Sequence, residues 1–243
     1  MYDMHHFSRA GRAVAGAVAA AAMLGALTGC STSGDGDKGK ATGKDKVAGK
    51  GTDKDSGGGH GGTKSTASSG RQLGGKGSAC VLPVTFDVAK SWKPKAVEPI
   101  PAGKDDHGFN ELLHQGGVQM VCEIDAKPAG HIGFLQVWTG PKSAADDKPR
   151  AVLERYLAEE SDDVRKTTYR DIEVGDDGVA AVEVVYSLYS KLMEESRQVS
   201  ALAVATPQGP VLLRLGGLDT EEHKDMLPAL ELAKESMTLS AAG

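Results

Sequence analysis

The chain has 243 residues and a formal net charge of −5, and this charge is unevenly divided along the sequence. Residues 1–30 carry a net charge of +1, residues 31–79 carry +4, and residues 80–243 carry −10. An acidic surface repels nucleic acid, so we exclude that class of partner for residues 80–243. The length gives room for one ordinary domain and a tail.

The first 30 residues have the order of an export signal. Residues 1–12 carry Arg9 and Arg12, and residues 13–27 contain no charge. That run is mostly alanine and glycine, and it is shorter than the roughly 20 residues that a membrane-spanning helix needs. A transmembrane helix and a plain secretory signal are the alternatives.

Leu27-Thr28-Gly29-Cys30 resembles the lipobox of bacterial lipoprotein precursors. The resemblance implies export by the Sec route, cleavage before Cys30, and acylation of Cys30, with palmitate among the acyl groups. It also implies a lipid-anchored location on the extracytoplasmic face of the cell membrane, because two acyl chains hold a protein stably where one is marginal. Residues 1–29 are then the signal peptide, and the membrane is a partner through the anchor.

Residues 30–79 follow as the lipidated cysteine and a linker. The segment 31–79 contains 15 glycines and almost no apolar residue. Such a segment cannot bury enough apolar surface to offset the entropy of ordering, so we predict a disordered tether. Its positive charge could contact anionic lipid or wall polymer, and a merely soluble spacer is the alternative.

From Cys80 onward, apolar runs alternate with turn signals, so residues 80–243 are predicted to form the globular domain. Residues 81–88 predict a strand with Val84, Phe86 and Val88 on one face. Pro94 disfavours helix and removes a backbone donor, so we expect it to end this element. Residues 95–117 are predicted to be irregular apart from a helical turn at 109–114, and loops of that length are commonly functional or mobile.

Six further strands and two helices are predicted. Residues 118–125 and 132–138 form a hairpin, and alternation places Val118, Met120, Cys122 and Ile124 on one face. The other strands are 167–174, 179–189, 198–206 and 211–215. One helix begins at Pro149, and the other covers 219–237, with Asp219 or Thr220 as its cap, and must kink or restart at Pro228. Their inward-facing residues recur at helical spacing and are Val152, Leu153, Tyr156 and Leu157 in the first helix and Met226, Leu230, Ala233 and Met237 in the second.

Consecutive hairpins with two covering helices predict an α+β fold, in which an antiparallel sheet of about six to seven strands is covered by two helices. Phe86-Asp87-Val88 followed by Ser91-Trp92, the central hairpins, and a terminal helix after Gly216-Gly217 resemble the PsbP-like fold of LpqN-type lipoproteins of high-GC Gram-positive bacteria. That resemblance covers about 160 residues. It implies a sandwich and an accessory role, such as docking onto another assembly, although a fold alone does not determine function.

Cys80 and Cys122 are the thiols that remain if Cys30 is acylated. Export would place them in an oxidising compartment, so we predict a disulfide between them. Two buried free thiols or a redox pair are the alternatives, and the sequence contains no C-x-x-C motif that would support redox chemistry.

Asp106, His107 and His114 are the best candidates for a metal or acid–base site, because carboxylate and imidazole groups suit zinc. His107 and His114 would converge if the loop folded back, whereas solvated loop residues are the alternative. Trp92, Phe109 and Tyr189 lie near breaks in the pattern and are candidates for a binding surface, whereas side chains that fill space at a sheet edge are the alternative. We expect no cofactor.

The sequence contains none of the G-x-S-x-G, S-x-x-K, Walker or H-E-x-x-H signatures of nucleophilic, nucleotide or zinc chemistry. We therefore predict a monomeric, non-enzymatic binding or interaction module that contacts an envelope protein or wall polymer. The alternatives are an envelope enzyme or metal-dependent hydrolase that uses the 95–117 loop, and a carrier of a small ligand or lipid. A carrier would need a sizeable apolar cavity between sheet and helices.

Overall fold

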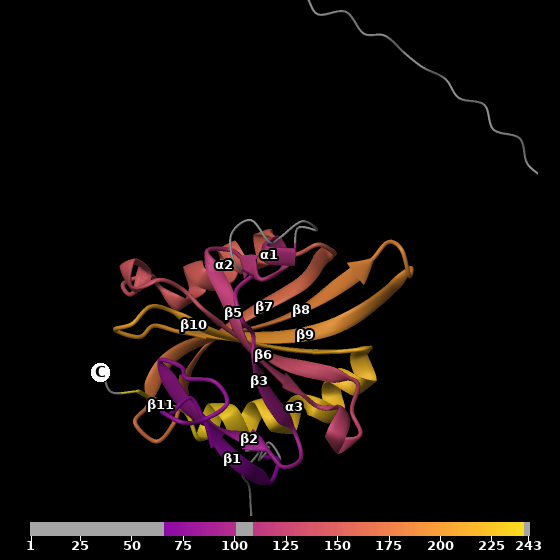
Figure 1. Ribbon diagram of the computed structural model, residues 1–243. Coiled ribbons are helices and arrows are strands. Elements are labelled where there is room, and N and C mark those ends of the chain that lie inside the picture. Colours follow the sequence, from indigo (N-terminus) through magenta and orange to yellow (C-terminus); the bar gives the residue numbers. More distant parts are fainter. Residues whose placement is uncertain (1–65, 101–108, 241–243) are drawn as a thin grey trace, which may run out of the picture. The chain divides into compact units, whose positions relative to one another are not determined.

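The computed structural model describes residues 66–100 and 109–240, and these residues form two antiparallel sheets (Figure 1). Two longer helices, α2 (Pro149–Ala158) and α3 (Thr220–Glu235), pack against the sheets, and α1 (Phe109–Leu112) is a single turn. The predicted α+β class is confirmed. Cys30, the segment 31–65 and the candidates Asp106 and His107 lie outside the described residues.

The larger sheet has eight strands in the order β3-β5-β6-β10-β9-β8-β7, with β4 paired to β5. Its strands are β3 (Lys93–Ala96), β4 (His114–Gln115), β5 (Val118–Asp125), β6 (Gly133–Thr139), β7 (Asp163–Val174), β8 (Val179–Ser190), β9 (Glu195–Val204) and β10 (Val211–Gly217). Six of the predicted strands form β5 to β10. The two additional strands, β3 and β4, come from or border the segment that the sequence predicts to be irregular.

The smaller sheet pairs β1 (Ser69–Leu73), β2 (Val84–Ala89) and β11 (Thr238–Leu239) in the order β1-β2-β11. The ordered domain therefore begins before Cys80, and the predicted disordered linker is wrong for residues 66–79. β1 escapes detection because four of its five residues are exposed and Leu73 alone is buried. Its pairing with β2 uses the backbone, which any sequence supplies.

Pro94 lies inside β3, although the sequence predicts that it ends an element. β3 is the edge strand of the larger sheet, and Pro94 pairs with Ile124 of β5. An edge strand tolerates proline because one side of it needs no backbone donor. The first part of the 95–117 segment is thus held by the sheet.

A bulge in β5 changes which side chains share a face. The pairing of β5 with β6 shifts between Met120 and Cys122. Val118 and Met120 consequently pack on one side of the sheet, whereas Cys122 and Ile124 are buried on the other. The predicted single face for all four residues is therefore wrong, because an inserted residue reverses the alternation.

The helix α2 covers one face of the larger sheet, which we call the α2 face. The four apolar side chains of α2 predicted to face inward are buried, and they meet side chains of β8, β9 and β10. The ring of Trp138 lies edge-on to that of Tyr156, with 5.2 Å between ring centroids. The other buried side chains of this cluster include Val182, Val184, Tyr186, Leu188, Val199, Ala201, Ala203 and Leu212.

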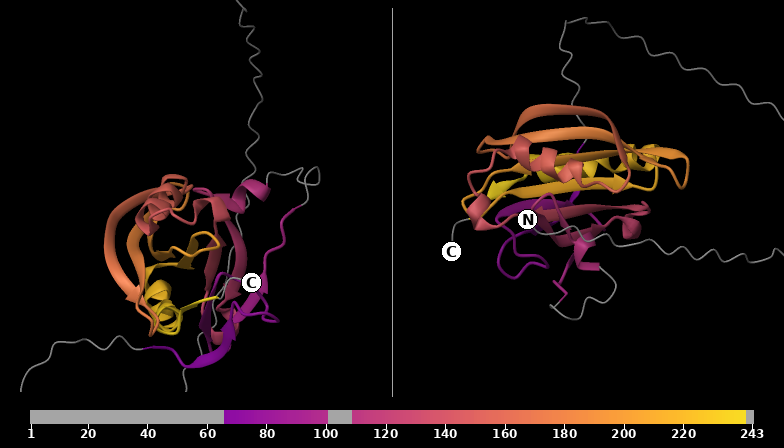
Figure 2. Two further views of the ribbon diagram at one scale, coloured as in Figure 1. Left: turned by 90° about the vertical axis from the view of Figure 1, so that its left-hand side faces the viewer. Right: turned by 90° about the horizontal axis from the view of Figure 1, so that it is seen from above.

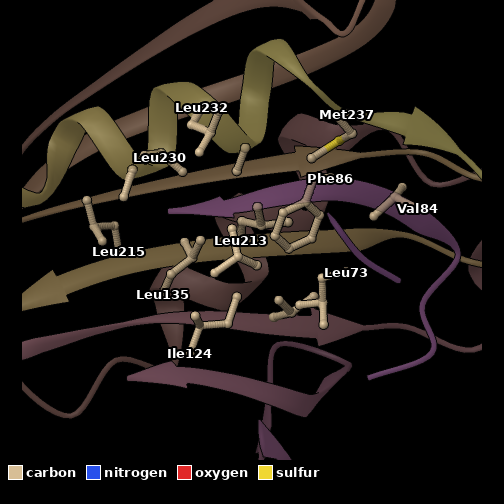
Figure 3. Close-up of a cluster of buried hydrophobic side chains, with 14 of the residues drawn as sticks. Leu73, Val84, Phe86, Ile124, Leu135, Leu213, Leu215, Leu230, Leu232 and Met237 are labelled. Carbon is tan, nitrogen blue, oxygen red and sulfur yellow. The ribbon is translucent and has the colours of Figure 1, made fainter. Parts of the chain in front are cut away.

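The opposite face of the larger sheet, the α3 face, is covered by α3 and the smaller sheet (Figures 1 and 2). Phe86 of β2, Leu213 of β10 and Leu230 of α3 belong to one buried cluster, and Figure 3 shows their side chains together. The predicted inward stripe of α3 is confirmed, since Met226, Leu230, Ala233 and Met237 are all buried.

The helix α3 starts as the sequence predicts, with the Asp219 carboxylate accepting a hydrogen bond from the backbone N–H of Glu222 at 2.9 Å. It runs without interruption through Pro228, so the predicted restart does not occur. Buried residues before and after Pro228 hold both halves against the sheet, and this packing offsets the missing backbone hydrogen bond.

Cys80 and Cys122 form the predicted disulfide, with 6.0 Å between their Cα atoms. Cys80 precedes β2 of the smaller sheet, and Cys122 lies in β5 of the larger one. The bridge therefore ties together two sheets that share no strand pairing.

Within residues 66–100 and 109–240, none of the helices is long and apolar enough to cross a membrane.

Candidate functional site

The structure does not assemble the predicted metal site from the residues that it describes. His114 lies in β4 with an exposed side chain, and its Nδ1 is 2.8 Å from the backbone carbonyl oxygen of Asn110. No group of three metal-ligating side chains occurs within the described ranges. His107 and Asp106 fall outside those ranges, so their convergence with His114 stays a prediction.

The three aromatic candidates have different positions. Trp92 is 4% exposed and packs in the cluster on the α3 face, so its predicted availability at the surface is wrong. The preceding Ser91 adopts a positive φ of 72°, which turns the chain after β2. Tyr189 is half-buried near the end of β8, with the Arg165 guanidinium 3.9 Å from its ring centroid. Phe109 begins α1, and its side chain is outside the described part of the structure.

A cleft of about 410 Å³ runs between α3 and the strands β7, β8 and β9. Its apolar lining comes from Val185 of β8 and from Leu227 and Pro228 of α3. Its polar lining comes from both walls and consists of Arg170, Glu183, Gln198, Ser200, His223 and Glu231, with Lys224 at the α3 side. The cleft thus combines an apolar wall with several convergent polar groups, which is the usual composition of a ligand pocket.

His223 and Ser200 form the buried polar pair of this cleft. The Nε2 atom of His223 lies 3.1 Å from the Ser200 hydroxyl, and the two residues are 0% and 1% exposed. The Nδ1 atom of His223 is buried and has no hydrogen-bond partner among the described residues. Ser–His catalytic sites carry a group on that nitrogen to orient the ring, so the pair lacks this part of a nucleophilic site.

Burial, together with the smaller effect of the Arg214 charge, lowers the pKa of His223 from 6.5 to about 4. The ring is therefore neutral at pH 7. One nitrogen of a neutral imidazole donates and the other accepts, so Nδ1 can complete one further hydrogen bond of either kind, according to the tautomer.

The lowered pKa of His223 predicts an acid-sensitive fold. Between pH 6.5 and pH 4 the unfolded chain protonates this histidine and the folded chain does not, so stability falls as the pH falls. From pH 7 to pH 5 the contribution is about 2 kcal/mol, at about 1.4 kcal/mol per pH unit below 6.5. We expect His223→Gln to lose this part of the pH dependence in denaturant unfolding. The exposed His114→Gln is the matched control, and parallel profiles for the two variants would contradict the prediction.

Ion pairs close one end of the cleft. The Lys234 ammonium of α3 lies 2.9 Å from a Glu183 carboxylate oxygen and 3.0 Å from one of Glu231, and Arg170 of β7 contacts the other oxygen of Glu183. Burial lowers the pKa of Lys234, but the hydrogen bonds and charges of Glu183 and Glu231 raise it more, so it lies above its ordinary value. Two cations and two carboxylates leave this end without net charge.

A second cluster of buried polar side chains lies on the α2 face, and its members contact one another. The Tyr186 hydroxyl donates to a Glu160 carboxylate oxygen at 2.6 Å, and the Arg214 guanidinium lies 3.4 Å from the same oxygen. Burial raises the pKa of Tyr186 well above its ordinary value, so it stays protonated. These contacts hold the end of α2 to the sheet.

A hollow with a larger volume, about 670 Å³, lies beside Pro149 and strands β7 and β8. Its charged lining residues, such as Lys148, Arg150 and Glu173, are exposed, and none of its buried lining residues is polar. We therefore regard it as a surface depression and place the candidate site in the cleft beside α3.

The residues of this cleft are absent from the sequence-based candidates. One signal was available, because His223 lies three residues before Met226 on the inward stripe of α3, where a histidine is unusual. Glu183 and Ser200 interrupt no strand pattern, since polar residues alternate with apolar ones in any half-buried strand. Only the sheet register brings Ser200 opposite Val185 and Arg170 opposite Glu183.

Comparison with known proteins gives one family. Residues 50–237 match the model of a protein family described as uncharacterised lipoprotein. No curated protein matches the chain. The matched range contains every residue that lines the cleft and both cysteines of the disulfide.

Proposed function

The chain belongs to this family of uncharacterised lipoproteins, and from that premise we propose that it is a lipid-anchored, non-enzymatic binding protein whose ligand occupies the cleft beside α3. Cys30 carries the acyl groups, and the residues that follow it tether the domain to the extracytoplasmic face of the cell membrane. The domain acts as a monomer and binds no nucleic acid, in keeping with the net charge of −10 on residues 80–243.

The cleft itself is the observation that carries this proposal. Its volume of about 410 Å³ lies within the range of about 300–1,000 Å³ that is usual for small-molecule sites. A lipoprotein that only docked onto another protein would need no such space between its sheet and α3. The cleft also meets the condition that the sequence sets for a carrier, a cavity between sheet and helix.

The lining chemistry favours an uncharged, largely apolar ligand. The ion pairs of Glu183 and Glu231 with Arg170 and Lys234 balance each other, and Lys224 lies 2.7 Å from Glu221. Val185, Leu227 and Pro228 supply apolar contact, and the buried Nδ1 atom of His223 has a hydrogen-bonding position that no described residue fills. A charged ligand would lose its hydration there without gaining an unmatched counter-charge.

The resemblance to the PsbP-like fold is part of the same proposal. A sheet of consecutive hairpins with a terminal helix on one face supports it. The two alternative functions have less support. A metal-dependent hydrolase would use His114, whose side chain instead contacts the backbone of Asn110. An enzyme with a nucleophilic serine would need a group that orients His223, and no described residue bonds its Nδ1 atom.

Filling the cleft tests the proposal. The mature lipidated chain is titrated with N-phenyl-1-naphthylamine, which is uncharged, and with 8-anilinonaphthalene-1-sulfonate, which adds a sulfonate to the same rings. We expect the uncharged probe to bind more tightly and its affinity to fall about tenfold or more in Leu227→Trp, because the larger ring occupies the apolar wall.

The matched control is Leu112→Trp, the same change at a leucine that is 69% exposed in α1. This variant should bind the probe like the unmodified chain. Equal affinity in all three proteins, or tighter binding of the sulfonate probe, would contradict the proposed site or its ligand class. Native mass spectrometry of the chain taken from its own envelope then identifies the natural ligand as an added mass that Leu227→Trp loses.

A further inference from the structure

Four of the seven large apolar side chains that are exposed in the described residues gather at one end of the larger sheet. Leu192 and Met193 are 91% and 65% exposed at the tip of the β8–β9 hairpin. Leu218 and Ile132 are 63% and 51% exposed, and the Leu218 N–H donates to the Ile132 carbonyl at 2.9 Å. We call these four residues the apolar end.

The sheet register places them at the same end of the sheet. Gly217 of β10 pairs with Gly133 of β6, so Leu218 and Ile132 adjoin the last pair of those strands. Gly216 pairs with Val199, and β9 continues for four more residues to Glu195. The hairpin therefore projects roughly 13 Å beyond that point, at about 3.3 Å per residue, and Figure 1 shows it extending past the neighbouring strands.

Side-chain contacts connect the base of the β8–β9 hairpin to β7 and to the residue before it. Lys191 Nζ lies 2.9 Å from an Asp163 carboxylate oxygen, and Arg165 stacks on Tyr189 at 3.9 Å. Arg197 and Asp162 form a further ion pair at 2.9 Å. These contacts hold the base of the hairpin, and Leu192 and Met193 lie at its outermost point, followed by the exposed Glu194 and Glu195.

We propose that this apolar end docks on the phospholipid bilayer that holds the lipid anchor, with Leu192 and Met193 inserted among the acyl chains. The inference rests on the proposed anchoring through Cys30. Between Cys30 and the first described residue lie 35 residues, and a flexible chain of that length would span roughly 30–35 Å. The domain thus stays at a high effective concentration near the bilayer, where a two-residue contact too weak to recruit a free protein suffices.

Tryptophan fluorescence tests the insertion. The mature lipidated Leu192→Trp chain is reconstituted in vesicles of phosphatidylcholine and phosphatidylglycerol that carry brominated acyl chains. The native Trp92 and Trp138 are 4% and 3% exposed, so bromine does not reach them from outside the domain. We expect the added tryptophan to be quenched about twofold or more, because Leu192 inserts to acyl-chain depth.

Leu112→Trp is the matched control, because α1 lies away from the apolar end. The next strand, β4, pairs with the first residues of β5, whereas the last residue of β5, Asp125, lies at the end of the sheet that carries Ile132 and Leu218. Its tryptophan should remain unquenched in the same vesicles. Flotation separates the two proposals. A wild-type chain that does not float with vesicles overturns the anchoring and the docking together. If the chain floats but the Leu192→Trp variant is quenched no more than the Leu112→Trp variant, the docking alone is overturned. The hairpin tip would then be a surface for a protein partner.

Discussion

Lys234→Met is expected to lower the free energy of unfolding by about 3 to 5 kcal/mol, because it removes the cation that lies between two buried carboxylates. The side chains of Lys234, Glu183 and Glu231 are 9%, 4% and 11% exposed, so solvent cannot replace the lost contacts. Methionine has a similar length and fills the same channel, so little of the loss comes from packing. Denaturant unfolding of both proteins at pH 7 measures the difference.

The same helix supplies the control. Lys224→Met makes an identical change at a lysine that is 53% exposed and pairs with the 82% exposed Glu221. Exposed pairs contribute little, so we expect a change within about 1 kcal/mol. In the double variant Lys234→Met/Glu231→Met, one of the two carboxylates is also removed, and part of the stability should return. Equal losses in Lys234→Met and Lys224→Met would show that the buried cluster is not the cause.

The elements that sequence predicts well are those whose periodicity is enforced by burial on one side. The inward residues of α2 and α3 recur at helical spacing, and Val182, Val184 and Tyr186 of β8 alternate because one face meets α2. In these elements local pattern and final environment agree. Many of these strands also pair with the next strand in the chain, such as β5 with β6 and β7 with β8. This explains why the sequence predicts the strands β5 to β10.

The failures have a common physical cause, which is that the decisive contact is with another strand, outside the short segment whose pattern is read. The strand β1 exists because its backbone pairs with β2, and the bulge in β5 exists because β6 lies beside it. Pro94 is acceptable because β3 happens to be an edge. None of these neighbours can be identified from a window of 10 residues.

The cleft is the extreme case of this dependence. Arg170, Glu183, Ser200 and His223 come from four different elements, and each looks ordinary in its own segment. Sequence can place a histidine on the inward stripe of α3, but it cannot tell whether that histidine meets a serine, a metal or a filled core. The disulfide was predictable because the number of remaining thiols left one possible pair.

Reducing the Cys80–Cys122 bridge is expected to lower the free energy of unfolding by about 4 kcal/mol, from the entropy of a loop of roughly 43 residues in the unfolded chain. The effect should be concentrated in the smaller sheet. That sheet shares no backbone pairing with the larger one, so the disulfide holds it to β5 and the side chains around Phe86 hold it against α3. Backbone amides of β1 and β2 should therefore exchange hydrogen faster after reduction, while those of β8 and β9 change less.

Comparing chemical reduction with mutation separates the cross-link from the space that the sulfurs fill. The Cys80→Ala/Cys122→Ala variant loses both, so it should be at least as destabilised as the reduced wild-type chain and insensitive to reductant. If reduction changed the wild-type free energy of unfolding by less than about 1 kcal/mol, packing alone would be holding the smaller sheet. The bridge would then reduce the entropy of the unfolded chain much less than the loop length predicts. This is the result expected if β1 and β2 stay close to β5 in the denatured state.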